Sequence, residues 1–334
     1  MAGQAGAVLA DAAAAVPLLS VEELSVDFRT REGTVRALER VGFTVGRGET
    51  VGIVGESGSG KSVTAYALMG ILDEAGQVTH GSAMFGGLNL LAAPERDLQR
   101  IRGRELSMIF QSPRTALNPI RAVGKQLEDV LLRHGNLRAR DARDRAIELL
   151  AQVKIPDPKR RYAAYPFELS GGMCQRIMIA LALACSPALL IADEPTTGLD
   201  VTTQAVIMDL IRELAADHGM ATVLITHDLG LASEYCDRIV VMHAGHVVET
   251  APMAVLFDAP RHPYTAKLIA ATPHFGGALH TLAAIGGSLP DLRGALPPCR
   301  YATRCERRIE VCDQPPLSRD WIAADHLVAC ANPL

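Results

Sequence analysis

The sequence predicts an α/β protein with a nucleotide-binding core and a small additional segment beyond it. Three observations indicate this class. An apolar run at residues 50–54 is followed by a glycine-rich loop and by a helical pattern at residues 62–72, which is the order of elements in nucleotide-binding units. Other short apolar runs are bounded by Pro and acidic residues, as in buried parallel strands. After residue 250 the chain contains more Pro, Gly and Arg.

The elements predicted before residue 250 are short strands, a helical subdomain and buried strands. Residues 18–54 predict short strands, because apolar and polar positions nearly alternate between turn residues. Residues of about 112–185 predict a helical subdomain from their helical spacing of apolar positions. Buried strands are expected at residues 188–192, 221–226 and 238–242.

The change of composition divides the chain. We expect a flexible tail at residues 1–17, a nucleotide-binding domain at residues 18–250 and a C-terminal extension at residues 251–334. Within the first domain lies the helical subdomain just described.

Charge and hydropathy exclude some classes of protein. The chain has 334 residues, 33 of them Lys or Arg and 37 Asp or Glu, which argues against non-specific binding to polyanions. The longest nearly uncharged apolar stretch, residues 177–192, is interrupted by Ser-Pro and is shorter than the ~20 residues of a membrane span. The Ala-rich start has no basic region, so a secretory signal is not expected and the protein should be cytosolic.

The loop after residues 50–54 fits the complete phosphate-binding pattern G-x-x-x-x-G-K-[ST]. Its glycines allow backbone N–H groups to turn inward, and the start of the next helix adds partial positive charge. Lys61 should contact the β- and γ-phosphates and take part in catalysis, and Ser62 should bind Mg²⁺. The residues expected to bind ATP here are Gly55, Ser57, Gly58, Ser59, Gly60, Lys61, Ser62 and, through its backbone, Val63.

Two carboxylates follow the buried strand at residues 188–192. Ligands of parallel sheets bind at the carboxyl ends of strands, so Asp193 is expected to hold Mg²⁺ and Glu194 to orient the attacking water. His227 follows the next strand and is expected near the γ-phosphate. The alternatives are an acidic turn for the pair and a structural role for the histidine.

Residues 169–176 read Leu-Ser-Gly-Gly-Met-Cys-Gln-Arg and predict a second helix with a serine cap and two glycines at its start. Such a helix start also accepts anions. Ser170, Gly171 and Gly172 resemble the signature motif of the ATP-binding cassette (ABC) family, which ordinary kinases and small GTPases lack.

The remaining motifs of that family occur in the same order. Gln111 resembles the Q-loop residue that binds ATP and Mg²⁺, Asp200 resembles the D-loop, and His227 resembles the switch histidine. Phe28 falls where an aromatic ring stacks on adenine in the family, although a phenylalanine on an alternating strand also fits a core position.

The resemblance implies the fold and the assembly. The fold is an ABC-type P-loop nucleotide-binding domain, with a RecA-like core, an antiparallel β subdomain and a helical subdomain. In this family two cassettes meet head to tail, and each ATP lies between the phosphate loop of one and the signature of the other. Ser170, Gly171 and Gly172 would therefore contact the ATP of a partner.

Four of the seven cysteines lie close together near the end of the sequence, at Cys299, Cys305, Cys312 and Cys330. Their spacing matches neither common zinc folds nor bacterial ferredoxins. The segment has little apolar material for a core, which favours stabilisation by a metal. Nearby arginines, which should offset thiolate charge and lower thiol pKa values, are Arg300, Arg304, Arg307 and Arg308.

This segment, together with His262-Pro263-Tyr264-Thr265, resembles the C-terminal extension of the oligopeptide and dipeptide ABC importer ATPases. Members of that subfamily can hold a [4Fe–4S] cluster on these cysteines. A structural or regulatory cluster is therefore expected, with zinc or no metal as the alternatives.

The sequence thus predicts an ATPase subunit that powers import of di- or oligopeptides, or of a related small solute. The resemblance implies a second ATPase subunit, two transmembrane permeases and an extracytoplasmic solute-binding protein as partners. A heterodimer of ATPases is expected, a homodimer being possible, at the cytoplasmic face of the inner membrane. The alternatives are a soluble ABC-type ATPase acting on nucleic acid or the ribosome, and an iron–sulfur protein with an incidental nucleotide site. A single cassette, the absence of heptads and the negative charge argue against nucleic acid as a partner.

Overall fold

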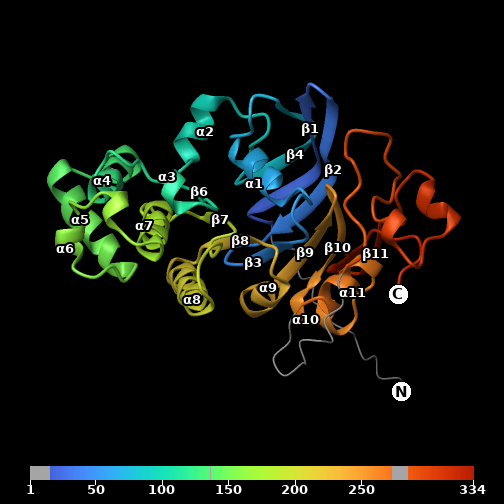
Figure 1. Cartoon of the computed structure of the whole chain (residues 1–334). Helices are drawn as coiled ribbons and strands as arrows, with labels where there is room; N and C mark the ends of the chain where they lie inside the picture. The colour runs from blue at the N-terminus through green and yellow to red at the C-terminus, as the bar shows by residue number, and fades with distance from the viewer. Residues whose placement is uncertain (1–15, 136, 273–284) are drawn as a thin grey trace, which may run out of the picture.

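The computed structural model describes residues 16–135, 137–272 and 285–334. Most of the predicted N-terminal tail therefore lies outside the described residues. Figure 1 shows a group of helices at one end, β-sheets in the middle and the C-terminal segment on the opposite side of the sheets. The α/β class and the ABC-type architecture predicted from the sequence are confirmed.

An eight-stranded sheet forms the centre of the molecule. Its strands are β3 (Thr50–Val54), β6 (Leu106–Ile109), β7 (Leu189–Asp193), β8 (Ala221–Thr226), β9 (Arg238–His243), β10 (His246–Pro252), β11 (Asp320–Ala323) and β12 (His326–Val328). Their spatial order is β11-β12-β10-β9-β3-β8-β7-β6. The five strands from β9 to β6 are parallel, whereas β10, β12 and β11 are antiparallel additions.

A second, antiparallel sheet has four strands in the order β2-β1-β4-β5. These are β1 (Leu19–Thr30), β2 (Gly33–Val45), β4 (Gly76–Phe85) and β5 (Leu88–Asn89). Helix α1 (Lys61–Met69) follows the phosphate loop. One hydrophobic core contains side chains of both sheets and of α1, which fixes the start of α1 relative to the strands.

Helix α2 (Glu95–Ile101) packs through Leu98 into the same core as α1. The other helices cover the second face of the main sheet and extend from it. They are α3 (Pro113–Ala116), α4 (Val123–His134), α5 (Ala139–Gln152), α6 (Pro158–Arg161), α7 (Gly171–Leu183), α8 (Val201–His218), α9 (Leu229–Tyr235), α10 (Met253–Asp258) and α11 (Pro263–Ala270). Helices α3 to α7 gather at one end (Figure 1), where the sequence predicts the helical subdomain. Among the described helices none combines the length and apolar character that crossing a bilayer requires.

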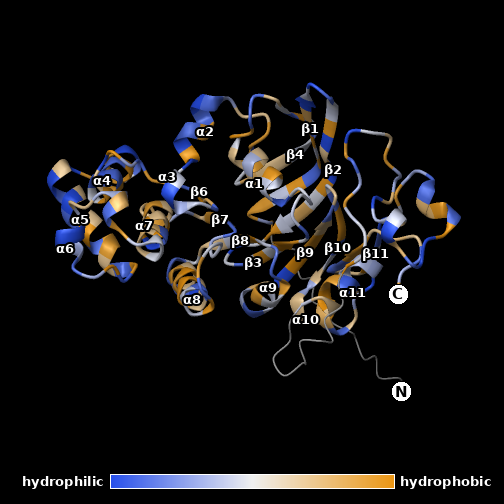
Figure 2. Cartoon of the chain, in the orientation of Figure 1, coloured by the Kyte–Doolittle hydropathy of each residue, from blue (hydrophilic) through white to orange (hydrophobic). Residues whose placement is uncertain are grey.

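Strand β7 shows why the centre of the sheet is apolar on both faces. Leu189 and Ile191 pack into the core shared with the second sheet, whereas Leu190 and Ala192 pack into the core shared with the helices. Successive side chains of a strand point to opposite faces, so a strand covered on both faces needs an uninterrupted apolar run. Figure 2 shows the central strands as largely hydrophobic.

The chain beyond residue 250 attaches to this sheet through β10. Glu249 of β10 is buried and accepts hydrogen bonds from the backbone N–H groups of Arg261 and His262, both at 2.8 Å. His326 of β12 lies 2.8 Å from the same carboxylate. The predicted division at residue 250 falls inside β10 and stays a prediction. Strands β11 and β12, which complete the sheet edge, were not predicted from the sequence.

Candidate active site

The carboxyl ends of four neighbouring parallel strands lie side by side in the main sheet. Strands β3, β8, β7 and β6 are adjacent and run in the same direction. The residues that follow them therefore meet at these strand ends, as ligand-binding residues of open α/β sheets do. Gly55 follows β3, Gln111 follows β6, Glu194 follows β7 and His227 follows β8.

The phosphate loop connects β3 to the first residue of α1. Gly55 has φ 154° and Gly60 has φ 102°, a region that residues with a Cβ atom rarely adopt. A Cβ atom on Gly55 would lie 2.1 Å from the carbonyl oxygen of Met242, so only glycine fits. Ser57 and Gly58 are exposed at the tip of the loop, where a phosphate can reach them.

Lys61 is the first residue of α1 and is 5% exposed. Its Nζ donates to the carbonyl oxygens of Gly55 at 2.8 Å and Glu56 at 3.0 Å. Burial lowers the pKa of Lys61, although the nearby carboxylates of Glu194 and Asp193 counteract this. The ammonium therefore lies folded onto the loop, beside the position expected for the phosphates.

Ser62 and Asp193 form a pair that fits Mg²⁺. The Ser62 hydroxyl donates to Asp193 Oδ1 at 3.0 Å. Asp193 Oδ2 is buried without a hydrogen-bond partner in the described part of the chain, and burial raises the pKa of this carboxyl. Hydroxyl and carboxylate oxygens suit Mg²⁺, which usually keeps several waters and binds substrate phosphates. A metal ion would satisfy the free oxygen.

Three side chains contact the carboxylate of Glu194. Two of them follow other strands of the sheet, and the third lies in the loop that contains Glu194. Gln111 Nε2 donates to Oε2 at 2.9 Å, Thr197 Oγ1 donates to the same oxygen at 2.7 Å, and His227 Nδ1 lies 3.2 Å from Oε1. Burial raises the pKa of Glu194, but hydrogen bonds from Thr197 and His227 outweigh it, so the net shift is downward. Glu194 is therefore ionised at neutral pH. Thr197 was missed by the sequence analysis.

The backbone of Glu194 is in the left-handed region, with φ 46°. This conformation is uncommon for a residue with a Cβ atom and persists only where surrounding contacts impose it. The N–H of Glu194 donates to the Ile225 carbonyl of β8 at 2.9 Å. The carboxylate thus comes from a fixed backbone position.

The signature residues open α7, as predicted. Ser170 Oγ accepts a hydrogen bond from a backbone N–H of the first turn at 3.3 Å, and a Cβ atom on Gly171 would have no neighbour within 4 Å. Within the described ranges no hydrogen bond joins Ser170, Gly171 or Gly172 to the phosphate loop. Their role toward the ATP of a partner stays a prediction. Cys174, on the same helix, is buried and donates its thiol to the Pro166 carbonyl at 3.4 Å.

Two further predicted residues have structural contacts of their own. Asp200 caps α8 and accepts hydrogen bonds from the N–H and hydroxyl of Thr203, at 3.0 and 2.7 Å. Phe28 is half-buried. Its partner on the paired strand β4 is Gly76, where a Cβ atom would lie 2.8 Å from the Phe28 ring. Close packing on that strand accounts for the ring's position. Adenine stacking by Phe28, Mg²⁺ binding by Gln111 and a D-loop role for Asp200 stay predictions.

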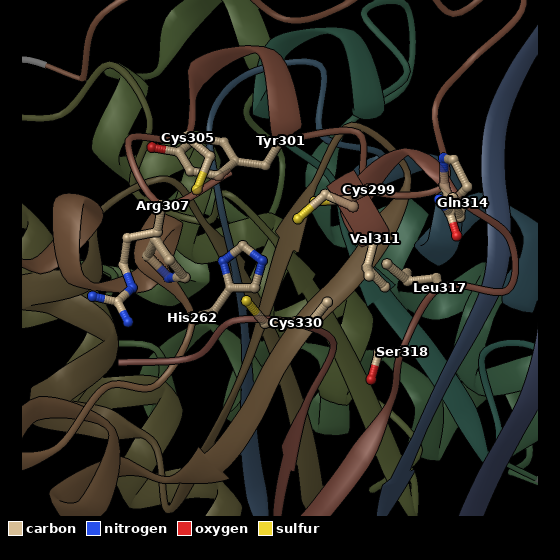
Figure 3. Close-up of a pocket in the computed structure, with 14 residues that line it drawn as sticks. His262, Cys299, Tyr301, Cys305, Arg307, Val311, Gln314, Leu317, Ser318 and Cys330 are labelled. Atoms are coloured by element: carbon tan, nitrogen blue, oxygen red, sulfur yellow. The ribbon is translucent and has the colours of Figure 1, made fainter. Parts of the chain in front are cut away.

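The four cysteines near residue 300 line one pocket between the extension and α11. Figure 3 shows the sulfur atoms of Cys299, Cys305 and Cys330 turned toward a common space beside the His262 ring; Cys312 lines the same pocket. Burial raises the pKa of Cys299 to about 11. Across the ranges that the structure describes, no three His, Cys, Asp or Glu side chains are grouped as for a single metal ion.

Of the four arginines predicted to lower thiol pKa values, Arg307 does so for Cys305 and Cys330, but burial outweighs its charge and the net shift of both thiols is upward. Burial raises the pKa of Cys305 as well as that of Cys299. Arg304 instead forms a two-bond ion pair with Glu56, at 2.7 and 2.9 Å. Arg300 donates to backbone carbonyls, among them that of Ala244 at 2.5 Å. Both guanidinium groups thus serve the nucleotide-binding core rather than the thiols.

The comparisons with known proteins agree with this geometry. Residues 38–197 match the family model for ABC transporters. Residues 248–312 match the model described as the oligopeptide/dipeptide transporter, C-terminal region. The chain belongs to the ABC transporter family and is an ATPase of that family.

Two named relatives narrow the family assignment to a group within the ABC transporters. The chain is 45% identical over 318 residues to the oligopeptide transport ATP-binding protein OppD of Salmonella typhimurium, covering 95% of this chain and 94% of that one. It is 46% identical over 318 residues to OppD of Haemophilus influenzae, covering 92% and 98%. Within the family it is an ATP-binding protein of the oligopeptide/dipeptide transporter group.

A solved structure shows a similar cassette in a dimer. The ATP-binding cassette MJ0796, bound to ADP and phosphate in a dimeric post-hydrolysis state, superposes with a TM-score of 0.63. It is 28% identical and covers 70% of this chain and 98% of its own.

Proposed function

We propose that this chain is the ATP-hydrolysing subunit that powers import of di- and oligopeptides, or of a related small solute, through partner membrane permeases. One observation carries the proposal: the same chain combines a complete hydrolytic set at the strand ends with the extension that marks the oligopeptide/dipeptide group. The alternative of an ATPase acting on nucleic acid or the ribosome gains no support from the relatives.

The geometry of the site supports a different role for each group of its residues. Lys61 and the loop would bind the phosphates, while Ser62 and Asp193 would hold Mg²⁺, which neutralises charge on the phosphates. Glu194 would accept a hydrogen bond from the attacking water, and His227 and Gln111 fix its carboxylate. Because phosphoryl transfer depends mainly on positioning and charge stabilisation, these fixed contacts are what hydrolysis needs.

The surface beside Gln111 supports docking of permeases. Ile120 is 86% exposed and Phe167 76% exposed, and the ring of Tyr165 stacks on Phe167 at 5.6 Å. The backbone joins these segments, because the Val123 N–H donates to the Ala164 carbonyl at 2.9 Å. An exposed apolar patch of this kind marks an interaction site. In the proposed assembly two permeases dock on the two ATPase subunits, and this patch is the docking surface of the present chain, at the cytoplasmic face of the inner membrane.

The full assembly would contain a second ATPase subunit and an extracytoplasmic solute-binding protein. At the start of α7 Ser170 is exposed and a Cβ atom on Gly171 would meet no neighbour within 4 Å, as a surface that receives a partner's ATP requires. We propose a heterodimer with a related cassette, in which each ATP bridges one phosphate loop and the other subunit's signature. A homodimer is the other arrangement that the geometry allows.

An uptake assay tests the proposed function. A strain that lacks this chain should lose accumulation of labelled di- and tripeptides, and the wild-type chain should restore it. Uptake of a free amino acid should not change, because its carrier does not contain this chain. If peptide uptake is normal in the deletion strain while uptake of nickel, haem or an opine is lost, the peptide assignment is wrong but the importer class holds.

We further propose that Cys299, Cys305, Cys312 and Cys330 hold a [4Fe–4S] cluster. Four thiols lining one pocket is the donor set that such clusters use. The described residues contain no group of three His, Cys, Asp or Glu side chains placed to hold a metal ion, so the proposal rests on the four thiols that line the pocket and on the resemblance of this segment. When bound, the cluster would cross-link the extension and stabilise it.

Metal analysis tests the cluster. Protein purified without oxygen should be brown and contain about four irons per chain, as expected for a [4Fe–4S] centre on four thiolates. Replacing Cys305 by Ser should remove the colour, whereas replacing Cys185, which lies outside the pocket, should not. Colourless protein with one zinc per chain, or with no metal, would contradict the proposal.

A further inference from the structure

The extension reaches the phosphate loop at Glu56, the second residue of the loop. Arg304 comes directly before Cys305 and is separated from Glu56 by 248 positions. Its two terminal nitrogens donate to the two carboxylate oxygens of Glu56 at 2.7 and 2.9 Å. The Arg304 side chain is only 3% exposed and that of Glu56 29% exposed. Paired, charge-assisted bonds in such a site are among the stronger polar contacts in proteins.

Arg304 is itself held in place. Its Nε donates to the Gly286 carbonyl at 2.9 Å, and its guanidinium lies 5.7 Å from the centre of the Tyr301 ring. Its Nη1 lies 3.1 Å from His243 Nε2. Burial lowers the pKa of His243 to about 4, so this histidine is neutral and does not compete with Arg304 for the carboxylate.

Every polar group of Glu56 has a partner. Its backbone N–H donates to the Tyr264 hydroxyl at 3.1 Å. Its carbonyl accepts from Lys61 Nζ at 3.0 Å and from the Ser59 N–H at 3.1 Å. The Arg304 hydrogen bond lowers the pKa of Glu56, so the carboxylate is ionised at neutral pH. Glu56 therefore connects the extension to the lysine that meets the phosphates.

A second arginine of the extension supports the other side of the loop. Arg300 is 1% exposed and donates to the Ala244 carbonyl in the turn between β9 and β10. The next residue, Gly245, donates its N–H to the Ser59 carbonyl at 2.8 Å. Two arginines from one short segment thus contact the loop, one directly and one through this turn.

We propose that Arg304 is a positioning residue for ATP: through Glu56 it holds the phosphate loop and Lys61, so the affinity for nucleotide depends on the C-terminal extension. Without Arg304, an unpaired carboxylate would remain beside the phosphates and the loop would lose its anchor. Both effects weaken binding of a polyanion. The inference rests on the ATPase activity of the family and not on what the four cysteines hold.

The test compares Arg304→Gln with Arg308→Gln. Arg308 lies in the same extension and pairs with Asp313 at 2.8 Å, but its side chain is 48% exposed, so its loss should matter little. The dissociation constants of Mg-ADP and Mg-ATP are measured for the purified full-length protein, together with KM and kcat. Arg304→Gln should raise the dissociation constants and KM roughly tenfold, the effect expected for one partly buried charged pair, with kcat changed less than about twofold.

A double-mutant cycle separates positioning through Glu56 from a general loss of structure. Glu56→Gln should also weaken binding, and Arg304→Gln combined with Glu56→Gln should be no weaker than Arg304→Gln alone, because both changes break one interaction. The thermal unfolding midpoint is recorded for each variant. If Arg304→Gln fails to fold, Arg304→Lys retains the charge and should give an intermediate dissociation constant.

Three outcomes would overturn the proposal. Arg304→Gln could lower the unfolding temperature yet bind nucleotide as tightly as Arg308→Gln, which would make Arg304 merely structural. The effects of Arg304→Gln and Glu56→Gln could multiply, which would show that they act independently. A fall in kcat without a change in KM or in the dissociation constants would place the effect outside nucleotide binding.

Discussion

The Lys61→Ala variant should lose transport and hydrolyse ATP at least about a hundredfold more slowly, as enzymes do when a charged group at the transferred phosphate is removed. Lys61 Nζ bonds two loop carbonyls and is the cation that we expect to contact the β- and γ-phosphates. Alanine keeps the helix start but leaves the developing charge uncompensated. The measurements are phosphate release by the purified transporter and peptide uptake in cells.

Lys154→Ala is the matched control for this variant. Lys154 is also a lysine, but its side chain is exposed and its Nζ lies 3.2 Å from the carboxylate of Glu213. It does not belong to the set of residues at the strand ends. Its hydrolysis and uptake should stay within about twofold of wild type, because exposed ion pairs contribute little. Normal uptake by Lys61→Ala, measured at equal protein level in the membrane, would refute the proposed mechanism.

Glu194→Gln should bind ATP normally and hydrolyse it at least about a hundredfold more slowly, in the range found when a positioned catalytic group is lost. The amide has the size of the carboxylate and can still bond Thr197 and Gln111, but it lacks the charge that orients and polarises water. Uncleaved ATP should therefore hold the two cassettes together. Light scattering should detect a dimer of ATPase subunits with Mg-ATP and its absence with Mg-ADP.

Glu213→Gln serves as the control, since Glu213 is an exposed carboxylate on α8 paired with Lys154. It should show wild-type turnover and no ATP-trapped dimer. Wild-type turnover by Glu194→Gln would exclude Glu194 as the residue that positions water. Loss of ATP binding would instead assign it a structural role in the nucleotide site.

The catalytic strands could be predicted because their sequence signals are local. Leu189 to Ala192 form an apolar run directly before two carboxylates, and the structure places it as β7, between β8 and β6 in the parallel part of the main sheet. The loop glycines and Lys61 lie within one short stretch, residues 55–61, so their joint role could be predicted without knowledge of distant contacts. The extension gave weaker signals, because β11 has only four residues, all exposed, and β12 only three, which is too short for an alternating pattern to mark them as strands.

The contacts that anchor the site could not be predicted, because they join residues far apart in the sequence. Glu56 is one of the variable positions of the phosphate-loop pattern, and its partner Arg304 lies among cysteines that drew attention to metal chemistry. Tyr264 belonged to a recognised motif, but its sequence neighbours do not show that its hydroxyl meets a loop N–H. Thr197 follows Glu194 by three positions and could have been noticed as a nearby hydroxyl.

The place of β12 in the main sheet has a consequence for how the protein matures. Strand β10 (His246–Pro252) is translated well before β12 (His326–Val328), which covers its free edge. An uncovered strand edge can pair with other chains, so the nascent polypeptide passes through an aggregation-prone interval during which chaperone protection is useful. Arg304 is translated in the same interval, so its ion pair with Glu56 of the phosphate loop can form only at this late stage of synthesis.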